Sequence, residues 1–272
     1  TLKLSPRCVM SGPARVLVLA NQKGGVAKTT TTLNLGVALK DRGARVLAID
    51  LDPQSNLSMS QGVDVENLPI TMYDVLVRGV PLKDIIQTRE IDIAPAGIEL
   101  AGAELALSAM IGRERQLERA IKPYLELYDY IMIDTPPSLG LLTINAMVAA
   151  DGVIVPVQCE YLSLRGLAQL NQTLGQVREH LNPRVSIVGI VPTMYDGRTV
   201  HSREAVMVLE ESFGDIVHQV RIGKTVKFAE APVEGKSVIR YDPTGQAARW
   251  YRRLADEVIA RDPRTHHGRA AA

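Results

Sequence analysis

Residues 23–29 place two lysines, two glycines and a threonine in a segment with the chemistry to bind phosphate. Gly24 and Gly25 allow a tight backbone turn that brings N–H groups close to a bound anion. Lys28 has the reach for the β- and γ-phosphates of a nucleotide, and the Thr29 hydroxyl is of the kind that ligates Mg²⁺. A helix that starts here adds the partial positive charge of its N-terminus. The segment therefore predicts a phosphate-binding loop for a nucleotide.

The loop departs from the common pattern G-x-x-x-x-G-K-[ST], because Gln22 and Ala27 stand where that pattern requires glycine. It is similar instead to a deviant form, K-G-G-x-G-K-[ST], which has a second lysine near its start, here Lys23. Ala27 is the one difference from that form. If the loop requires a positive φ at Ala27, its Cβ atom costs about 1–2 kcal/mol. The two lysines and the four threonines at 29–32 favour a ligand over a plain glycine-rich connection.

Three aspartates stand where apolar runs end. Asp134 is placed to hold Mg²⁺, directly or through water, opposite Thr29. Asp50 and Asp52 are two residues apart, so in a strand their side chains share one face. One carboxylate near the γ-phosphate would orient the attacking water. The spacing does not decide which of the two does so, although Pro53 suggests that the chain leaves the strand there, with Asp52 nearer the edge.

Continuous apolar runs alternate with amphipathic segments, which predicts a parallel sheet covered by helices on both faces. Strands are expected at residues 15–20, 45–51, 91–95, 129–134, 152–157 and 185–191. Helices are expected at about residues 29–41, 99–111, 114–127 and 244–261. The predicted fold is an α/β, three-layer P-loop NTPase fold with a mostly parallel, twisted sheet. Its carboxyl edge, where ligands bind in such folds, carries the loop and the aspartates.

The composition is that of a globular protein, with 272 residues, of which 46% are hydrophobic and 22% charged. We expect one ATPase domain at 15–261, a flexible arm at 1–14 and a flexible tail at 262–272. The 4% aromatic content disfavours a nucleic-acid binder built on base stacking, and a net charge of +1 identifies no acidic partner. Cys8 and Cys159 have no metal-ligand spacing, and no apolar run approaches 18 residues. We therefore expect a soluble cytoplasmic protein.

Four motifs together give the chain a specific resemblance. They are Lys23-Gly-Gly-Val-Ala-Lys-Thr29, Asp50-Leu-Asp-Pro-Gln54, Ile133-Asp-Thr-Pro-Pro-Ser138 and Met194-Tyr-Asp-Gly-Arg-Thr199. This set resembles the ParA/Soj partition ATPases, within the group of deviant P-loop ATPases that also contains MinD. The likeness continues through Pro156–Tyr161 and Glu230–Lys236 and covers roughly residues 14–261.

The resemblance implies an ATP- and Mg²⁺-dependent enzyme that forms a nucleotide-sandwich homodimer. Lys23 would reach the phosphates in the other subunit and stabilise charge as an arginine finger does. Asp52 takes the role of positioning water, and Thr29 and Asp134 take the magnesium role. The implied phosphate-binding residues are Lys23, Gly24, Gly25, Val26, Ala27, Lys28, Thr29 and, at the α-phosphate, Thr30.

The resemblance also implies non-specific DNA binding by basic residues on one face of the ATP-bound dimer. The matching positions are Arg198 and Lys227, and Arg221 and Lys224 extend the patch at three-residue spacing. Lysine and arginine contacts to phosphate give affinity without reading sequence. Relatives have Ile-Pro-Arg-Asn near the adenine base where this chain has Ile222-Gly-Lys-Thr225, so Gly223 and Thr225 would contact the base through backbone groups.

The expected function is DNA segregation on the nucleoid, with hydrolysis stimulated by a ParB-like partner. A MinD-like ATPase that positions protein cargo is the alternative, but the end of the chain lacks an amphipathic helix that inserts into a membrane. An iron–sulfur reductase is disfavoured because Cys8 stands in the arm. A repressor with a helix-turn-helix domain is disfavoured because the expected arm has only about 14 residues, far fewer than such a domain needs.

Overall fold

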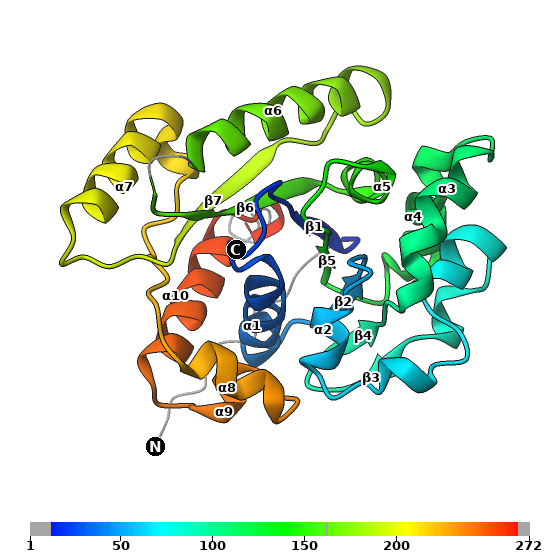
Figure 1. Ribbon diagram of the computed structural model, residues 1–272, viewed down its shortest axis with the longest axis horizontal. Coiled ribbons are helices and arrows are strands. Elements are labelled where there is room, and N and C mark those ends of the chain that lie inside the picture. The colour runs from blue at the N-terminus through cyan, green and yellow to red at the C-terminus, as the bar shows by residue number, and fades with distance from the viewer. Residues whose placement is uncertain (1–11, 161–162, 266–272) are drawn as a thin grey trace, which may run out of the picture.

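A central seven-stranded sheet organises the computed structural model, which describes residues 12–160 and 163–265 (Figure 1). The strand order is β3-β4-β2-β5-β1-β6-β7, and every neighbouring pair is parallel except β3 and β4. The strands are β1 (Arg15–Leu19), β2 (Val46–Asp50), β3 (Gln87–Thr88), β4 (Asp92–Ala94), β5 (Tyr130–Asp134), β6 (Gly152–Gln158) and β7 (Ile187–Thr193). The short antiparallel β3 was not foreseen.

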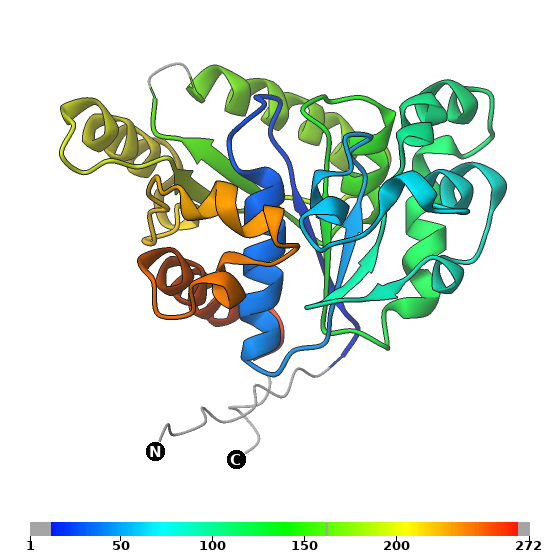
Figure 2. The ribbon, with the colours of Figure 1, turned by 60° about the horizontal axis from the view of Figure 1, so that its bottom comes forward.

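Helices connect the strands and cover both faces of the sheet (Figure 2). The α-helices are α1 (Lys28–Asp41), α2 (Asn56–Met59), α3 (Ala103–Ser108), α4 (Gln116–Ile121), α5 (Leu141–Ala149), α6 (Ser163–His180), α7 (Val200–Phe213), α8 (Lys227–Val233), α9 (Val238–Tyr241) and α10 (Gln246–Ala260). Single 3₁₀ turns occupy Val65–Asn67, Leu82–Asp84, Ile98–Gly102, Arg113–Arg115, Lys122–Tyr124, Gly214–Ile216 and Pro263–Thr265, and Asp74–Arg78 forms a π-helix. Over the described residues, no helix is long and apolar enough to cross a membrane.

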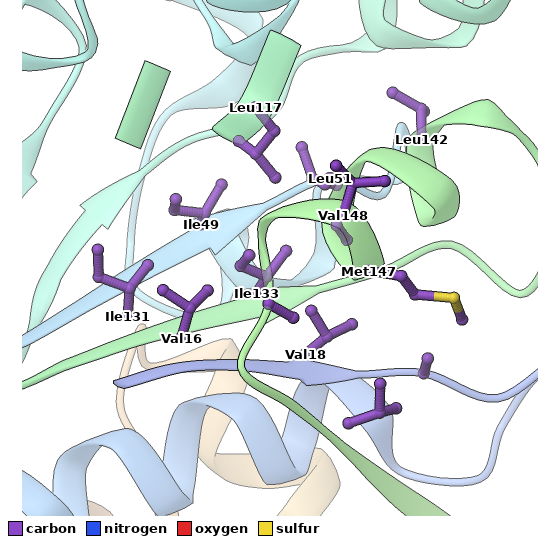
Figure 3. Close-up of a cluster of buried hydrophobic side chains, with 14 of the residues drawn as sticks. Val16, Val18, Ile49, Leu51, Leu117, Ile131, Ile133, Leu142, Met147 and Val148 are labelled. Carbon is purple, nitrogen blue, oxygen red and sulfur yellow. The ribbon is translucent and has the colours of Figure 1, made fainter. Parts of the chain in front are cut away.

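Strand β1 shows why both sheet faces are covered. Its residues alternate between two separate hydrophobic clusters, since successive side chains of a strand point to opposite faces. Val16 and Val18 pack with α3 to α6, whereas Leu17 and Leu19 pack with α1, α9 and α10. Figure 3 shows the first of these clusters, where Val16 and Val18 lie beside apolar residues of β2, β5 and α5. The three-layer α/β prediction is therefore confirmed.

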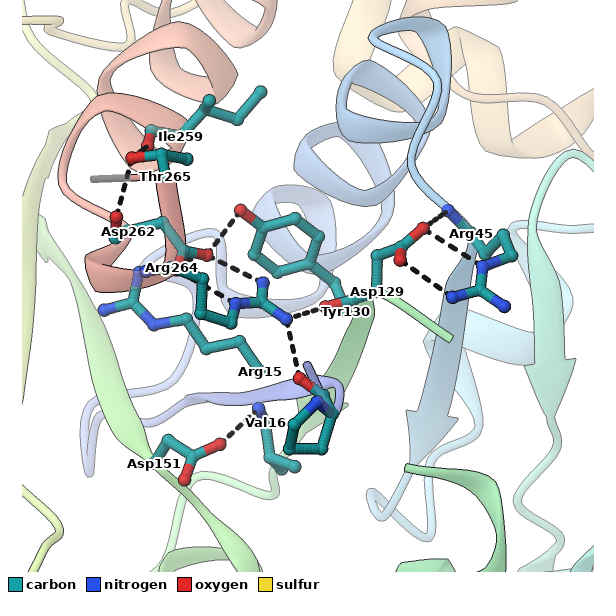
Figure 4. A network of polar contacts seen from close by, with 11 residues as sticks. Arg15, Val16, Arg45, Asp129, Tyr130, Asp151, Ile259, Asp262, Arg264 and Thr265 are labelled. Atoms are coloured by element: carbon teal, nitrogen blue, oxygen red, sulfur yellow. Dashed lines mark hydrogen bonds and ion pairs between the residues drawn. The ribbon is translucent and has the colours of Figure 1, made fainter. Parts of the chain in front are cut away.

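The amino edge of the sheet is closed by residues that were expected to belong to a flexible tail (Figure 4). Asp262 is fully buried, accepts a 2.8 Å hydrogen bond from the Tyr130 hydroxyl and pairs with Arg264 at 2.7 Å. Arg264 also donates to the carbonyl oxygens of Pro13 and Asp129, at 2.8 and 2.9 Å. The predicted boundary at residue 261 is therefore too early, because these charged residues are fixed by partners distant in sequence. Residues 1–11 and 266–272 of the predicted arm and tail lie outside the described residues.

Candidate nucleotide-binding site and basic cleft

The predicted phosphate loop runs from the carboxyl end of β1 to the start of α1, and β1 lies between β5 and β6 in the sheet. The Asn21 amide donates to the carbonyl oxygen of Pro156 in β6 at 2.8 Å, and its oxygen accepts the Lys23 N–H at 3.0 Å. Further along the loop, the Thr193 hydroxyl at the end of β7 donates to the Val26 carbonyl oxygen at 3.1 Å. Neighbouring strands therefore fix the loop at both its start and its middle.

Two positions of the loop, Gly25 and Ala27, have left-handed backbone. Gly25 has φ 71°, a conformation in which glycine carries no Cβ penalty. Ala27, the position just before α1, has φ 71° and ψ 33°. The positive φ considered from the sequence is therefore present, and Ala27 carries its strain. Gly24 does not have a positive φ. A Cβ added there would lie 3.9 Å from Pro137, which is an ordinary contact.

Lys28 is buried at the first position of α1. Burial lowers the pKa of its ammonium, and the nearby carboxylates of Asp134 and Asp52 oppose this shift. Its Nζ atom has one hydrogen-bond acceptor among the described residues, the Lys23 carbonyl oxygen, at a long 3.4 Å. A buried cation with so little hydrogen bonding is suited to bind a phosphate oxygen.

Thr29 and Asp134, the two residues predicted to hold Mg²⁺, are hydrogen-bonded to each other. The Thr29 hydroxyl donates to Asp134 Oδ2 at 2.6 Å, and the Thr32 hydroxyl donates to Oδ1 at 3.2 Å. Burial, followed by repulsion from Asp50, raises the pKa of Asp134 to about 8. Such a carboxylate is stabilised by a cation, and Mg²⁺ commonly binds one carboxylate together with substrate phosphates and water. Over the described residues, no group of three or more acidic, histidine or cysteine side chains that could hold a metal ion is found.

The structure separates the two aspartates that the sequence left open. Asp50 pairs in register with Asp134 across β2 and β5 and is fully buried. Its carboxylate accepts the Ser58 hydroxyl at 2.7 Å, the Ser58 N–H at 2.9 Å and the Asp52 N–H at 3.1 Å. Asp52 lies beyond the end of β2, and its Oδ1 accepts the Gln54 N–H at 3.0 Å. The Asp50 carboxylate is thus occupied by protein donors, whereas Asp52 keeps accepting capacity.

Lys23 and Thr30 lie on opposite sides of the loop. The exposed ammonium of Lys23 donates to Gln158 at 2.9 Å and pairs with Glu160 at 3.1 Å, both at the end of β6. Thr30 is half-buried on α1, and with Thr29 it lines a small cavity that also includes Phe228. Lys23 therefore faces solvent, as a residue that acts on a second subunit requires.

A second feature is a cleft of about 460 Å³ between the β7–α7 loop, the segment that precedes α8, and α10. We call it the basic cleft; its lining includes Tyr195, Asp196, Arg198, Arg221, Gly223, Lys224, Trp250 and Arg253. Arg198 is 90% exposed and pairs with Asp196 at 2.8 Å, and it lowers the pKa of that carboxyl to about 2. Arg221 pairs with Glu210 at 2.9 Å. Lys224 and Arg253 have no ion pair within the described part of the chain.

Comparison with known proteins gives a consistent picture. A family model described as an AAA domain, AAA_31, matches residues 14–187. The sporulation initiation inhibitor protein Soj of Bacillus subtilis is 45% identical over 249 residues, which cover 90% of this chain and 98% of Soj. The chromosome partitioning protein ParA of Caulobacter vibrioides is 44% identical over 257 residues, which cover 93% of this chain and 96% of ParA.

The chain belongs to the ParA/Soj family of partition ATPases. A solved structure of similar fold is that of cobyrinic acid a,c-diamide synthase from Mycobacterium smegmatis with bound ADP and magnesium. It is 39% identical, with a TM-score of 0.80, over 90% of this chain and 94% of that one.

Two of the residues predicted for this ParA-family protein, Lys227 and Thr225, do not line the basic cleft. Lys227 does not line the cleft; its ammonium pairs with Glu230 at 2.7 Å and lies 5.3 Å from the centre of the Tyr241 ring. Thr225 accepts the Lys227 N–H with its hydroxyl at 3.3 Å, at the start of α8. Gly223 packs beneath Trp250 in the cleft. Adenine contacts by Gly223 and Thr225 stay a prediction.

The sequence reasoning missed Trp250 and Arg253 as functional candidates. Leu254 and Val258 on the same helix are buried in the hydrophobic cluster on that face of the sheet. An adjoining face of the same helix, with Trp250 and Arg253, forms one wall of the basic cleft. An aromatic and a basic residue three positions apart on a predicted helix were the available signal.

Proposed function

We propose that this partition ATPase binds ATP with Mg²⁺ and uses its hydrolysis to control DNA binding. The observation that carries the proposal is the buried Lys28 beside the Thr29–Asp134 pair, at the mouth of a loop with left-handed backbone. These are the parts that phosphoryl transfer needs, because its catalysis is largely positioning and charge stabilisation. The names of the Soj and ParA relatives support the partition role.

In the proposed reaction, a water oxygen attacks the γ-phosphorus of ATP and the bond to the β–γ bridging oxygen breaks. ADP leaves with that electron pair, and the water proton passes to phosphate or solvent. Asp52 orients the water by accepting its hydrogen bond, and Lys28 binds the β- and γ-phosphates. Thr29 and Asp134 would hold Mg²⁺, which neutralises charge on the phosphates. Lys23 acts on the nucleotide of the second subunit of a sandwich dimer.

The basic cleft is proposed as the DNA site, with Arg198, Arg221, Lys224 and Arg253 contacting backbone phosphates. Such contacts depend on salt and do not read sequence. One cleft offers few cations, so a dimer that presents two clefts binds DNA far more tightly than a monomer. Lys227 at the start of α8 is a further contact at the margin. A ParB-like partner would stimulate hydrolysis, split the dimer and release it from nucleoid DNA.

The test is binding to non-specific double-stranded DNA with ATP, with ADP and without nucleotide, at two salt concentrations. We expect salt-sensitive binding with ATP alone, and loss of that binding in Arg198→Glu. The matched control is Arg89→Glu, which makes the same charge change at an exposed arginine on the loop after β3, outside the basic cleft. Equal DNA affinity of Arg198→Glu and the wild type would exclude the basic cleft.

A different result would favour the alternative function. If no nucleotide state binds DNA while ATP hydrolysis persists, the protein positions protein cargo, and anionic lipid vesicles are the next surface to test. The Mycobacterium smegmatis relative bears the name of an amide synthase. Soj and ParA are more similar to this chain in sequence, over nearly their whole length, and their names therefore favour the partition role in our proposal.

A further inference from the structure

Trp250 and Glu257 of α10, together with Arg261 just after it, contact the segment 216–223. Arg261, directly after the last turn of α10, donates to the carbonyl oxygens of Ile216 and Val217, both at 3.1 Å. At the other end of the helix, Trp250 covers Gly223, where an added Cβ would lie 2.5 Å from the indole ring. The segment therefore runs antiparallel to the helix and leads directly into the basic cleft.

Glu257 stands between these two contacts and binds the middle of the segment. Its Oε2 accepts the His218 Nδ1–H at 2.9 Å and the Gln219 N–H at 3.0 Å, and its Oε1 accepts the Val220 N–H at 3.0 Å. Three donors on one partly buried carboxylate make a strong attachment, because hydrogen bonds to a charged acceptor are stronger than neutral ones.

The other side of the segment is attached to the sheet. The His218 N–H donates to the carbonyl oxygen of Ile190 in β7 at 2.8 Å, and the His218 ring lies against Gly189, where a Cβ would approach Nε2 to 2.5 Å. The Ile222 N–H donates to the carbonyl oxygen of Pro192 at 2.8 Å. The segment is thus held between β7 and α10, and the Glu257 carboxylate supplies three of the bonds on the helix side.

The residues of α10 that face the segment and the cleft follow helical spacing: Trp250, Arg253 and Glu257 are three and four positions apart and share one face. Arg221 and Lys224 follow the clamped residues within one and four positions. The Arg221 guanidinium also pairs with Glu210 at 2.9 Å, but the backbone that carries Arg221 and Lys224 is set relative to Arg253 by the attachment that Glu257 makes.

We propose that Glu257 is the positioning residue of the basic cleft: it fixes Arg221 and Lys224 relative to Arg253 so that they meet successive DNA phosphates. This inference rests on the proposed DNA binding by the cleft. Glu257 touches no phosphate itself, and as an anion one helical turn from Arg253 it repels DNA. Its positioning role and its electrostatic role therefore have opposite signs.

That opposition gives a decisive experiment, the ATP-dependent DNA affinity of Glu257→Gln. Loss of the negative charge alone would tighten DNA binding, whereas loss of the three-donor acceptor loosens the cleft. We expect DNA binding to weaken by about fivefold or more. The magnitude of the slope of log affinity against log salt concentration should fall by about 1, which corresponds to the loss of one phosphate contact. The ATP dissociation constant should change much less than the DNA affinity, because the phosphate loop lies at the opposite side of β7 and only the predicted base contacts of Gly223 and Thr225 adjoin the residues that Glu257 binds.

The matched control is Asp256→Asn, which removes the neighbouring carboxylate of α10. Asp256 pairs with Arg42 at 2.7 Å, away from the cleft, so its loss should leave DNA affinity unchanged or slightly tighter. Glu257→Asp is the second variant: it keeps the charge but is too short to reach three donors, so it too should bind DNA more weakly.

The outcomes are distinguishable. Tighter or unchanged DNA binding by both Glu257 variants would overturn the inference while the proposed function stands. Absence of DNA binding by the wild type would overturn the proposed function itself. If Glu257→Gln does not fold, as a thermal melt would report, the comparison of Glu257→Asp with the wild type decides the matter.

Discussion

Replacing Ala27 by glycine should stabilise the protein, although glycine usually destabilises. Ala27 has φ 71° and ψ 33°, and an L-residue in that region carries about 1–2 kcal/mol of strain, which glycine removes. Glycine also makes the unfolded chain more flexible, at a cost of roughly 0.5–1 kcal/mol. The middle values of these two terms leave a net gain of about 0.75 kcal/mol in the free energy of unfolding, equal to a rise of about 1.5–3 °C in Tm for a domain of this size.

The assay is urea and thermal unfolding of Ala27→Gly beside a matched control, Ala229→Gly. Ala229 is exposed within α8, so the same chemical change should lower stability there by about 0.5–1 kcal/mol. If the loop keeps its conformation when nucleotide binds, the strain cancels from the ATP dissociation constant, which should then change less than about threefold. Equal destabilisation by both substitutions would refute the reasoning from backbone strain. A large gain in ATP affinity without a gain in stability would show that the loop rearranges on binding.

The remaining predictions concern the charged groups of the loop. Burial raises the pKa of Asp134 to about 8 and that of Asp50 to about 6, so the folded protein retains protons that the unfolded chain releases near pH 4. Stability without Mg²⁺ should therefore fall as the pH rises from about 4 to about 8, and Asp134→Asn should flatten the upper part of that curve in urea unfolding. Asp52→Ala should bind ATP with normal affinity and hydrolyse it at least about tenfold more slowly, whereas Asp50→Ala should lower Tm, because it leaves the buried donors of Ser58 unpaired. A normal rate in Asp52→Ala would remove that residue from the reaction. Lys23→Ala should keep the Tm and the ATP affinity of the wild type, since the surface ion pair with Glu160 contributes little to stability. It should nevertheless lose ATPase activity. An unimpaired steady-state rate would argue against a lysine that acts across a dimer.

The sheet could be predicted closely because its strands are continuous apolar runs buried on both faces. The segments expected at 15–20, 45–51 and 129–134 correspond to β1, β2 and β5 within one residue at each end. Helices were predicted less well. The helix expected at 114–127 is α4 flanked by 3₁₀ turns, and Pro123, which lacks an N–H group, stands in the second of these turns. Strand β3 has two residues, too few for any periodic pattern.

The phosphate loop was visible in the sequence because its residues are neighbours in the chain. The basic cleft was only partly visible, since Arg198 and Arg253 are far apart in sequence and meet through the packing of α10. The family resemblance predicted Lys227 as a DNA-binding residue, but its position at the start of α8 turns its ammonium toward Glu230. Glu257 gave no signal, because a glutamate on an amphipathic helix looks like any solvent-facing charge.

The bond from Arg264 to the Pro13 carbonyl oxygen has a consequence for engineering. It holds two residues near opposite limits of the described chain together at the amino ends of the strands, while the phosphate loop opens at the carboxyl ends (Figure 4). A short linker between residues 265 and 12 would therefore give a circular permutant with an intact sheet, and new termini would be tolerated best in an exposed turn. The same geometry allows a label or a surface tether to be attached at that end of the molecule, so that the nucleotide edge faces solution.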